Sequence, residues 1–164
     1  MTDEYTYTIL LEPRGKGRPV FTRATGSART PEATRAWEHE AAHQLRERHA
    51  TCAYVVVEDD SALPWDAVHP LLEVEVRAYH RAPSSRPKWC DLMLWRQWRA
   101  SDTIRLPATT RHDLDNIVKI TLDAMQIARV IHNDRSVVSI VAGSYYAFDT
   151  EAPRVEVTVR PVTP

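Results

Sequence analysis

Alternation of hydrophobic and polar positions predicts four β-strands along the chain. Residues 5–11 and 72–78 place apolar side chains at every second position, which is typical of a strand with one buried face. Residues 154–160 show the same period with valine, and residues 137–148 are rich in β-branched and aromatic side chains. We expect 137–148 and 154–160 to form an antiparallel hairpin around residues 150–153.

A longer apolar period predicts two α-helices. Thr30 and Pro31 form a favourable helix start, with threonine at the N-cap and proline at the first helical position. This helix should run to about residue 50, and Trp37, Ala41 and Leu45 should form its inner face. The second helix covers residues 114–125, where apolar residues recur three and four positions apart. A short helix is expected within 83–110, whose tryptophans are close to helical spacing.

The order strand, helix, strand, loop, helix, strand, strand is typical of an α+β domain. A chain of 164 residues is the right length for one such domain, spanning residues 1–164. Its 43% hydrophobic and 26% charged residues are ordinary for a globular protein. No apolar run has the length of a membrane span, and no basic start or apolar stretch of a signal peptide is present. We therefore expect a cytoplasmic protein that does not enter a membrane.

Charge is strongly segregated, although the formal net charge is only −1. Residues 58–75 contain acidic side chains but no lysine or arginine. In the basic loop at 13–31 and the tryptophan-rich insertion at 83–110, by contrast, most charged side chains are arginine or lysine. Phosphate binding requires only such local concentration of positive charge. Nucleic-acid binding and solvated, arginine-rich loops are both compatible with the pattern.

The start of the second predicted helix carries the most informative polar residues. Asp113 and Asp115 lie two positions apart, so in an extended chain their carboxylates point the same way. Asp115 is also a possible N-cap, and Lys119 follows it by one helical turn. A third carboxylate, Asp134, comes shortly before the strand at 137–148. Such carboxylates suit Mg²⁺, which prefers oxygen ligands and supports phosphodiester hydrolysis.

The spacing alone also fits a purely structural interpretation. Asp115 then caps the helix, Lys119 pairs with it at the surface, and Asp134 belongs to a turn. The tryptophans of 83–110 likewise fit either stacking on DNA or packing within the protein, and we expect at least two of them to pack.

Two regions of the sequence, in the same order, resemble the RusA-type endodeoxyribonucleases, which resolve Holliday junctions. The first runs from Lys16 through Gly-Arg-Pro-Val-Phe-Thr to Arg23, with Thr30-Pro31 ahead of a helix. The second is Asp113-Leu-Asp-Asn-Ile-Val-Lys119, followed by Leu-Asp-Ala-Met and Asn133-Asp134. The resemblance covers most of the chain except residues 51–71 and the detail of 83–110.

The resemblance implies a mixed β-sheet packed by helices, a homodimer, and paired nicks across four-way DNA junctions. It assigns metal binding to Asp113, Asp115 and Asp134, with Mg²⁺ as cofactor and Mn²⁺ as a possible substitute. Lys119 matches the essential lysine of the family and completes the catalytic set. Residues expected to bind DNA phosphates are Arg14, Lys16, Arg18, Arg23 and Arg111.

Four positions depart from the family pattern. Asn133 stands where an acid usually precedes the final aspartate, and Ser136 replaces the usual glutamine. Arg111-His112 replaces the lysine and proline ahead of the first aspartate. Asn133 keeps an oxygen ligand but loses a charge, which would lower metal affinity.

Two other functions remain open. One is a dimer that binds branched DNA without cutting it. The other is a nuclease acting on flaps or other branched DNA, which would need the same catalytic residues.

Overall fold

A four-stranded mixed sheet forms the centre of the computed structural model, which describes residues 4–22, 27–49, 71–109 and 112–162. The strand order is β1-β6-β4-β5. Strand β6 (Arg154–Val162) pairs antiparallel with both β1 (Tyr5–Ile9) and β4 (Leu71–His80), whereas β5 (Val137–Tyr146) runs parallel to β4. The mixed sheet expected from the family resemblance is confirmed.

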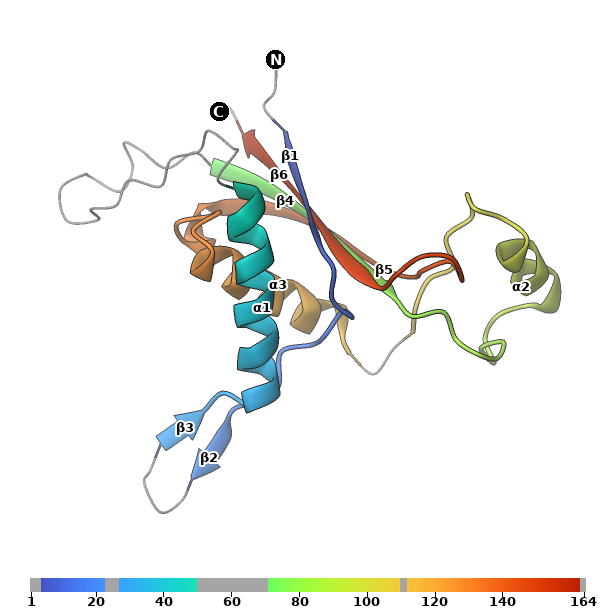
Figure 1. The fold of residues 1–164 in the computed structure, drawn as a ribbon, viewed down its shortest axis with the longest axis horizontal. Coiled ribbons are helices and arrows are strands. Elements are labelled where there is room, and N and C mark those ends of the chain that lie inside the picture. Colours follow the sequence, from blue (N-terminus) through green and yellow to red (C-terminus); the bar gives the residue numbers. More distant parts are fainter. Residues whose placement is uncertain (1–3, 23–26, 50–70, 110–111, 163–164) are drawn as a thin grey trace.

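Two long helices pack on one face of this sheet (Figure 1). They are α1 (Glu32–His49) and α3 (Leu114–Ile127), as the apolar periods predicted. The inner face of α1 is formed by the expected Trp37, Ala41 and Leu45, all of them buried. Helix and strand side chains together form the main core, to which the sheet contributes Leu72, Val74, Val76, Val155, Val157 and Val159.

The opposite face of the sheet is polar, because alternate residues of each strand point away from the helices. Arg160 of β6 lies on this face, and its guanidinium hydrogen-bonds the carboxylates of Glu4, Glu73 and Glu75. The alternation of apolar and polar residues in the strands therefore corresponds to a sheet that is covered by helices on one face only.

The predicted hairpin between the last two strands is wrong. Strands β5 and β6 are separated in the sheet by β4, which pairs with both. After β5 the chain passes the end of β4, where Ala147 N donates to His80 O at 2.8 Å, and then enters the sheet on the other side. The β4–α3–β5 segment is thus a parallel crossover with its helix on one face of the sheet.

The basic loop is partly ordered into strands, which the sequence did not predict. Strands β2 (Val20–Thr22) and β3 (Ser27–Arg29) form an antiparallel hairpin that projects from the start of α1 (Figure 1). Residues 51–70 lie outside the described part of the chain.

The insertion before α3 contains the expected short helix, α2 (Leu92–Arg99). Asp91 caps it, since its side chain accepts hydrogen bonds from Met93 N and Leu94 N. Trp98 is buried and Trp95 partly buried, which confirms that at least two tryptophans pack within the protein. They belong to a second small core with Cys90, Leu106, Tyr146 and Phe148. No described helix has the length and apolar character of a membrane span.

Candidate metal-binding and DNA-binding site

Asp113 occupies the N-cap position of α3, with an extended backbone (φ −65°, ψ 141°). Its carbonyl accepts the first helical hydrogen bonds, from Asn116 N and Ile117 N, but its carboxylate makes no capping bond. The carboxylate is exposed and is therefore available to a ligand. Because the helix begins at Leu114, the expectation that Asp115 is the N-cap, and that both acids lie on extended chain, is wrong.

Asp115 lies in the first turn of α3 and pairs with Lys119, whose Nζ is 3.0 Å from Asp115 Oδ2. Both side chains are mostly exposed, at 64% and 60%. The hydrogen bond from Lys119 lowers the pKa of the Asp115 carboxyl below its usual range. Asp115 is therefore an anion at neutral pH beside the Lys119 cation, and both groups are accessible to a ligand.

Asp134 begins a short 3₁₀ turn, η1 (Asp134–Ser136), just ahead of β5. Asn133 caps this turn: its Oδ1 accepts from Arg135 N at 3.0 Å. Ser136 Oγ in turn donates to Asn133 O at 2.6 Å. The two departures from the family pattern, Asn133 and Ser136, thus both hold the turn that presents Asp134, whose side chain is exposed.

The structure does not bring the three aspartates together within one chain. Helix α3 has 14 residues, which corresponds to a length of about 21 Å. The chain leaves its far end through Arg129 (φ 60°), and Val130 N bonds back to Met125 O. In Figure 1 the orange segment that follows α3 and enters β5 lies at the end of the helix opposite to Leu114. Asp134 is thus remote from Asp113 and Asp115.

Consistent with this separation, no group of three or more histidine, cysteine, aspartate or glutamate side chains in the described ranges is placed to hold a metal ion. Each chain offers an exposed acidic pair at the start of α3 and one exposed carboxylate near its other end.

A cavity of about 280 Å³ lies beside the acidic pair, between the basic loop, the start of α1 and the start of α3. Lys16 N donates to Asn116 O at 3.0 Å, and Gly17 N donates to Thr34 Oγ1 at 3.2 Å, so the loop is attached to both helices. The cavity is lined by Arg14, Gly15, Lys16, Gly17, Arg18, Pro31, Thr34, His112, Asp113 and Asn116.

The glycines of this loop permit its close approach to the helices. A Cβ at Gly17 would lie 2.8 Å from Thr34 Oγ1, and one at Gly15 would lie 3.0 Å from His112 Nδ1. Larger residues would push the loop outward. The cavity therefore combines the backbone of the basic loop, two arginines and the Asp113 carboxylate.

The ammonium group of Lys16 forms an ion pair with Asp123 of α3. Its positive charge is therefore already partly neutralised within the protein. Asp123 is also hydrogen-bonded to Glu38, a side chain of α1 that is only 8% exposed. Burial, and then the charge of Asp123, raise the pKa of the Glu38 carboxyl. The two carboxyl groups and Lys16 form a linked cluster between α1, α3 and the basic loop.

The structure places the residues predicted to bind DNA in different surroundings. Arg14, Lys16 and Arg18 line the cavity, and Lys16 also forms the ion pair with Asp123. Arg23 and Arg111 lie outside the described residues. Glu38, Thr34 and Asn116 were not singled out from the sequence, and only Asn116, adjacent to Asp115, carried a signal that pointed to the site.

A comparison with models of known protein families gives a match over nearly the whole chain. A family model described as Endodeoxyribonuclease RusA matches residues 11–160. That range includes both the basic loop and all three aspartates. A search of curated proteins found no match.

Proposed function

Since the chain belongs to the RusA endodeoxyribonuclease family, we propose that it resolves four-way DNA junctions by Mg²⁺-dependent cleavage, acting as a homodimer. The observation that carries the proposal is the start of α3. There the exposed Asp113 and Asp115 carboxylates adjoin Lys119 on one side and the basic, glycine-containing cavity on the other.

The residues present fit a magnesium ion. Asp113 offers a carboxylate that caps no backbone, and Asp115 offers one that remains ionised at neutral pH. Both supply the hard oxygen ligands that Mg²⁺ prefers, and an exposed pair leaves positions for water and phosphate. When bound, the ion would supply an activated water and stabilise the developing charge on the phosphate.

The protein groups around this pair would orient the DNA. Arg14 and Arg18 would neutralise phosphates next to the cleaved bond, and the loop backbone would fix the strand against Asp113. Lys119 is close enough to Asp115 to donate to the departing or bridging oxygen once the carboxylate binds metal. Contacts of this kind read charge and shape, as junction recognition requires.

The distance along α3 supports a site shared between two chains. Asp113 and Asp115 lie at one end of the helix, and Asp134 follows the other end. In a dimer with two-fold symmetry, the start of α3 in one subunit can lie against the segment that follows α3 in the other, and the symmetry produces this contact at two places. We therefore assign the third metal ligand to Asp134 of the partner subunit. Two such sites in a symmetric dimer would cut the two opposed strands that resolution requires.

Cleavage of a synthetic four-way junction, a flap and a linear duplex, each with and without Mg²⁺, tests this function. We expect paired nicks in the junction only with the metal, and none from Asp113→Asn. Glu47→Gln, which removes one charge from the exposed side of α1, is the matched control and should cut like wild type. Junction binding without cleavage under Mg²⁺ or Mn²⁺ would refute the proposal in favour of a binding protein. Faster cleavage of flaps would refute the junction specificity and retain the nuclease.

A further inference from the structure

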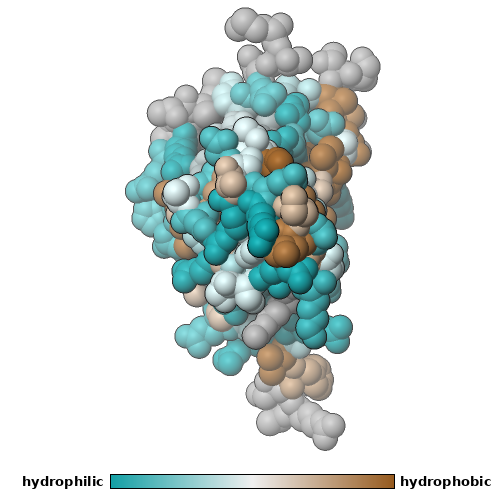
Figure 2. All heavy atoms as spheres, turned by 90° about the vertical axis from the view of Figure 1, so that its right-hand side faces the viewer, coloured by the Kyte–Doolittle hydropathy of each residue, from teal (hydrophilic) through white to brown (hydrophobic). Residues whose placement is uncertain are grey.

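The insertion that carries α2 forms a separate small unit at one end of the molecule. Figure 2 views this end, where hydrophilic side chains surround a small hydrophobic area. Trp89, Leu92 and Met93 are exposed there by 46%, 47% and 62%. Lys88 and Arg96 are exposed on the same unit and form no ion pair with any residue that the structure describes. The unit therefore has the surface of a binding element, apart from the catalytic residues.

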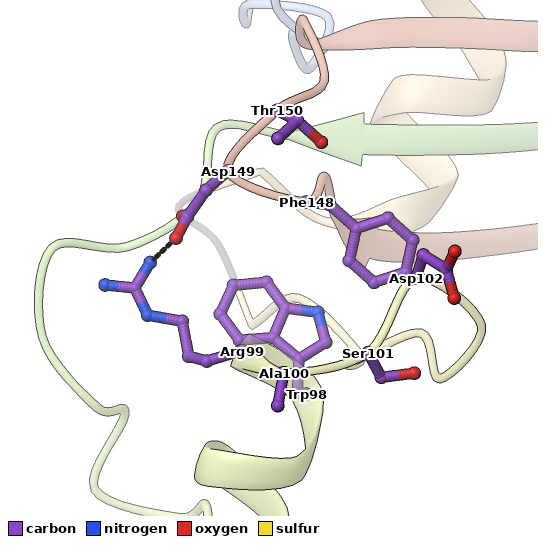
Figure 3. Close-up of a pocket in the computed structure, with 8 residues that line it drawn as sticks. All are labelled: Trp98, Arg99, Ala100, Ser101, Asp102, Phe148, Asp149 and Thr150. Atoms are coloured by element: carbon purple, nitrogen blue, oxygen red, sulfur yellow. Dashed lines mark hydrogen bonds and ion pairs between the residues drawn. The ribbon is translucent and has the colours of Figure 1, made fainter.

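A cavity of about 360 Å³ lies between the end of α2 and the turn that joins β5 to β6 (Figure 3). Its volume is at the lower end of the range for small-molecule sites, which suits one planar ring system. Two short segments line it, and their residues are Trp98, Arg99, Ala100, Ser101, Asp102, Phe148, Asp149 and Thr150.

Trp98 leaves an unused hydrogen-bond donor at this cavity. Its side chain is 1% exposed, and its Nε1 has no hydrogen-bond partner among the described residues. Figure 3 shows Nε1 on the edge of the indole that faces Phe148 and Asp102. Buried polar groups are almost always paired, and an indole N–H can only donate. The Trp98 N–H is therefore available to an acceptor on a ligand in this cavity.

The charged side chains that line the cavity restrict the kind of ligand that could bind there. Arg99 is neutralised by Asp149 and lies over the rings of Trp95 and Trp98, at 5.2 and 5.9 Å from their centroids. Its charge is thus already compensated, and the cavity is not built for an anion. Asp102 is exposed and pairs with no described cation, so it provides an acceptor for a ligand N–H.

We propose that this cavity binds an unpaired nucleobase of branched DNA. A base presents a ring nitrogen or carbonyl acceptor beside an N–H donor on one edge, which matches the Trp98 donor and the Asp102 acceptor. Phe148 offers an aromatic neighbour for the ring, and Lys88 and Arg96 lie on the same unit to contact the flanking phosphates. Enzymes that read a single base extrude it into such a pocket. The proposal rests on the proposed action on DNA.

The test compares two duplexes that differ at one position, where one carries an extra unpaired adenine and the other an abasic residue. Binding of the full chain is measured by fluorescence anisotropy without Mg²⁺, so that no strand is cut. We expect wild type to bind the adenine duplex about fivefold tighter, the effect of a net hydrogen bond. Trp98→Phe, which keeps a ring but removes the donor, and Asp102→Ala, which removes the acceptor, should both lose this preference.

Two matched controls accompany these variants. Trp89→Phe removes an indole donor on the same unit, one that pairs with Thr109 instead, and Glu47→Gln removes an exposed acid elsewhere. Both should keep the preference for adenine. Circular dichroism reports whether Trp98→Phe folds. If it does not, Asp102→Ala, a substitution at an exposed position, decides alone.

Equal affinity of wild type for the two duplexes would overturn the proposal, as would a preference that survives in Asp102→Ala. Its failure is distinguishable from failure of the nuclease function. A protein that distinguishes adenine from the abasic residue but never cuts a junction retains the base site and loses the proposed reaction. A protein that cuts junctions without this discrimination retains only the reaction.

Discussion

Lys16 pairs with Asp123, a residue 107 positions later in the chain, and this ion pair attaches the basic loop to helix α3. The same loop is held by the backbone bond from Lys16 N to Asn116 O. Glu38 lies behind Asp123 and is almost fully buried. The lysine therefore positions the loop, and Arg14 and Arg18 are the two arginines that line the adjacent cavity.

The substitution Asp123→Asn distinguishes two effects of this carboxylate on DNA binding: its ion pair with Lys16, which holds the loop, and its negative charge, which repels phosphates. Removing a negative charge beside DNA would by itself strengthen binding. If the carboxylate holds the loop, the variant should instead bind a four-way junction several-fold more weakly at fixed salt. Anisotropy titrations without Mg²⁺ measure the affinity, with Glu47→Gln as a change of equal charge on α1. Tighter binding by Asp123→Asn would show that the ion pair does not position the loop.

A mixture of two inactive variants tests the shared metal site. Asp113→Asn and Asp134→Asn homodimers should each be inactive. In a mixed dimer, one of the two sites would combine the intact Asp113 of one chain with the intact Asp134 of the other. We expect the mixture to nick one strand of a junction and not both. If every site used aspartates of a single chain, each would carry one defect and mixing would restore no cleavage.

Lys119→Ala should lower the cleavage rate about a hundredfold or more, the usual effect of removing one donor to a developing negative charge. Stability should hardly change, because the Asp115–Lys119 pair is exposed and such pairs contribute little. Single-turnover cleavage and thermal unfolding are the two measurements. Arg35→Ala, which removes an exposed cation from α1, is the control. A parallel loss of melting temperature and activity would argue for a structural lysine.

His80 makes stability depend on pH. Burial, and then the charge of His112, lower its pKa from 6.5 to about 4. The unfolded chain therefore takes up a proton near pH 6.5 and the folded chain does not until about pH 4. Stability is complete above pH 6.5 and falls as the pH is lowered, by about 3 kcal/mol in total.

The groups that face His80 are Ser144, whose Oγ is 3.1 Å from Nε2, and Glu12, whose carboxylate is 4.0 Å from Nδ1. His80→Gln keeps a neutral hydrogen-bonding side chain that cannot titrate. Urea unfolding should show a stability gap in favour of wild type at pH 7.5 that narrows towards pH 4. A gap that stays constant over this range would mean that His80 titrates normally in the fold.

Glu151 joins the second core to the turn before β6. Its carboxylate accepts two hydrogen bonds from Arg105, at 2.5 and 3.0 Å, which lower its pKa to about 2. Arg105 also lies 3.9 Å from the centroid of Phe148, so loss of its partner would leave a partly buried charge. Glu151→Gln should lower the free energy of unfolding by about 2 kcal/mol at pH 7.

Asp149→Asn is the matched comparison, since the Arg99–Asp149 pair is more exposed and should contribute less than about 1 kcal/mol. Because the folded pKa of Glu151 is depressed, its contribution is complete above pH 4.5 and disappears as the pH falls towards 2. Equal effects of the two substitutions in urea unfolding at pH 7 would contradict this assignment.

The sequence by itself determined the features that depend on local geometry. The apolar periods located α1, α3 and the sheet strands, because backbone conformation sets which neighbouring side chains share a face. The Asp115–Lys119 pair was predictable for the same reason, since residues one helical turn apart meet on the helix surface. The family resemblance added the catalytic residues, which spacing alone could not separate from caps and turns.

Only the tertiary structure decided how these pieces meet. Strand β5 pairs with β4 and not with β6, because a strand pattern specifies which face is buried but not which neighbour completes the hydrogen bonds. Lys16 meets Asp123 through packing of segments far apart in the chain. Asp134, expected beside Asp113 and Asp115, lies beyond the opposite end of α3, because a rigid helix of that length separates them.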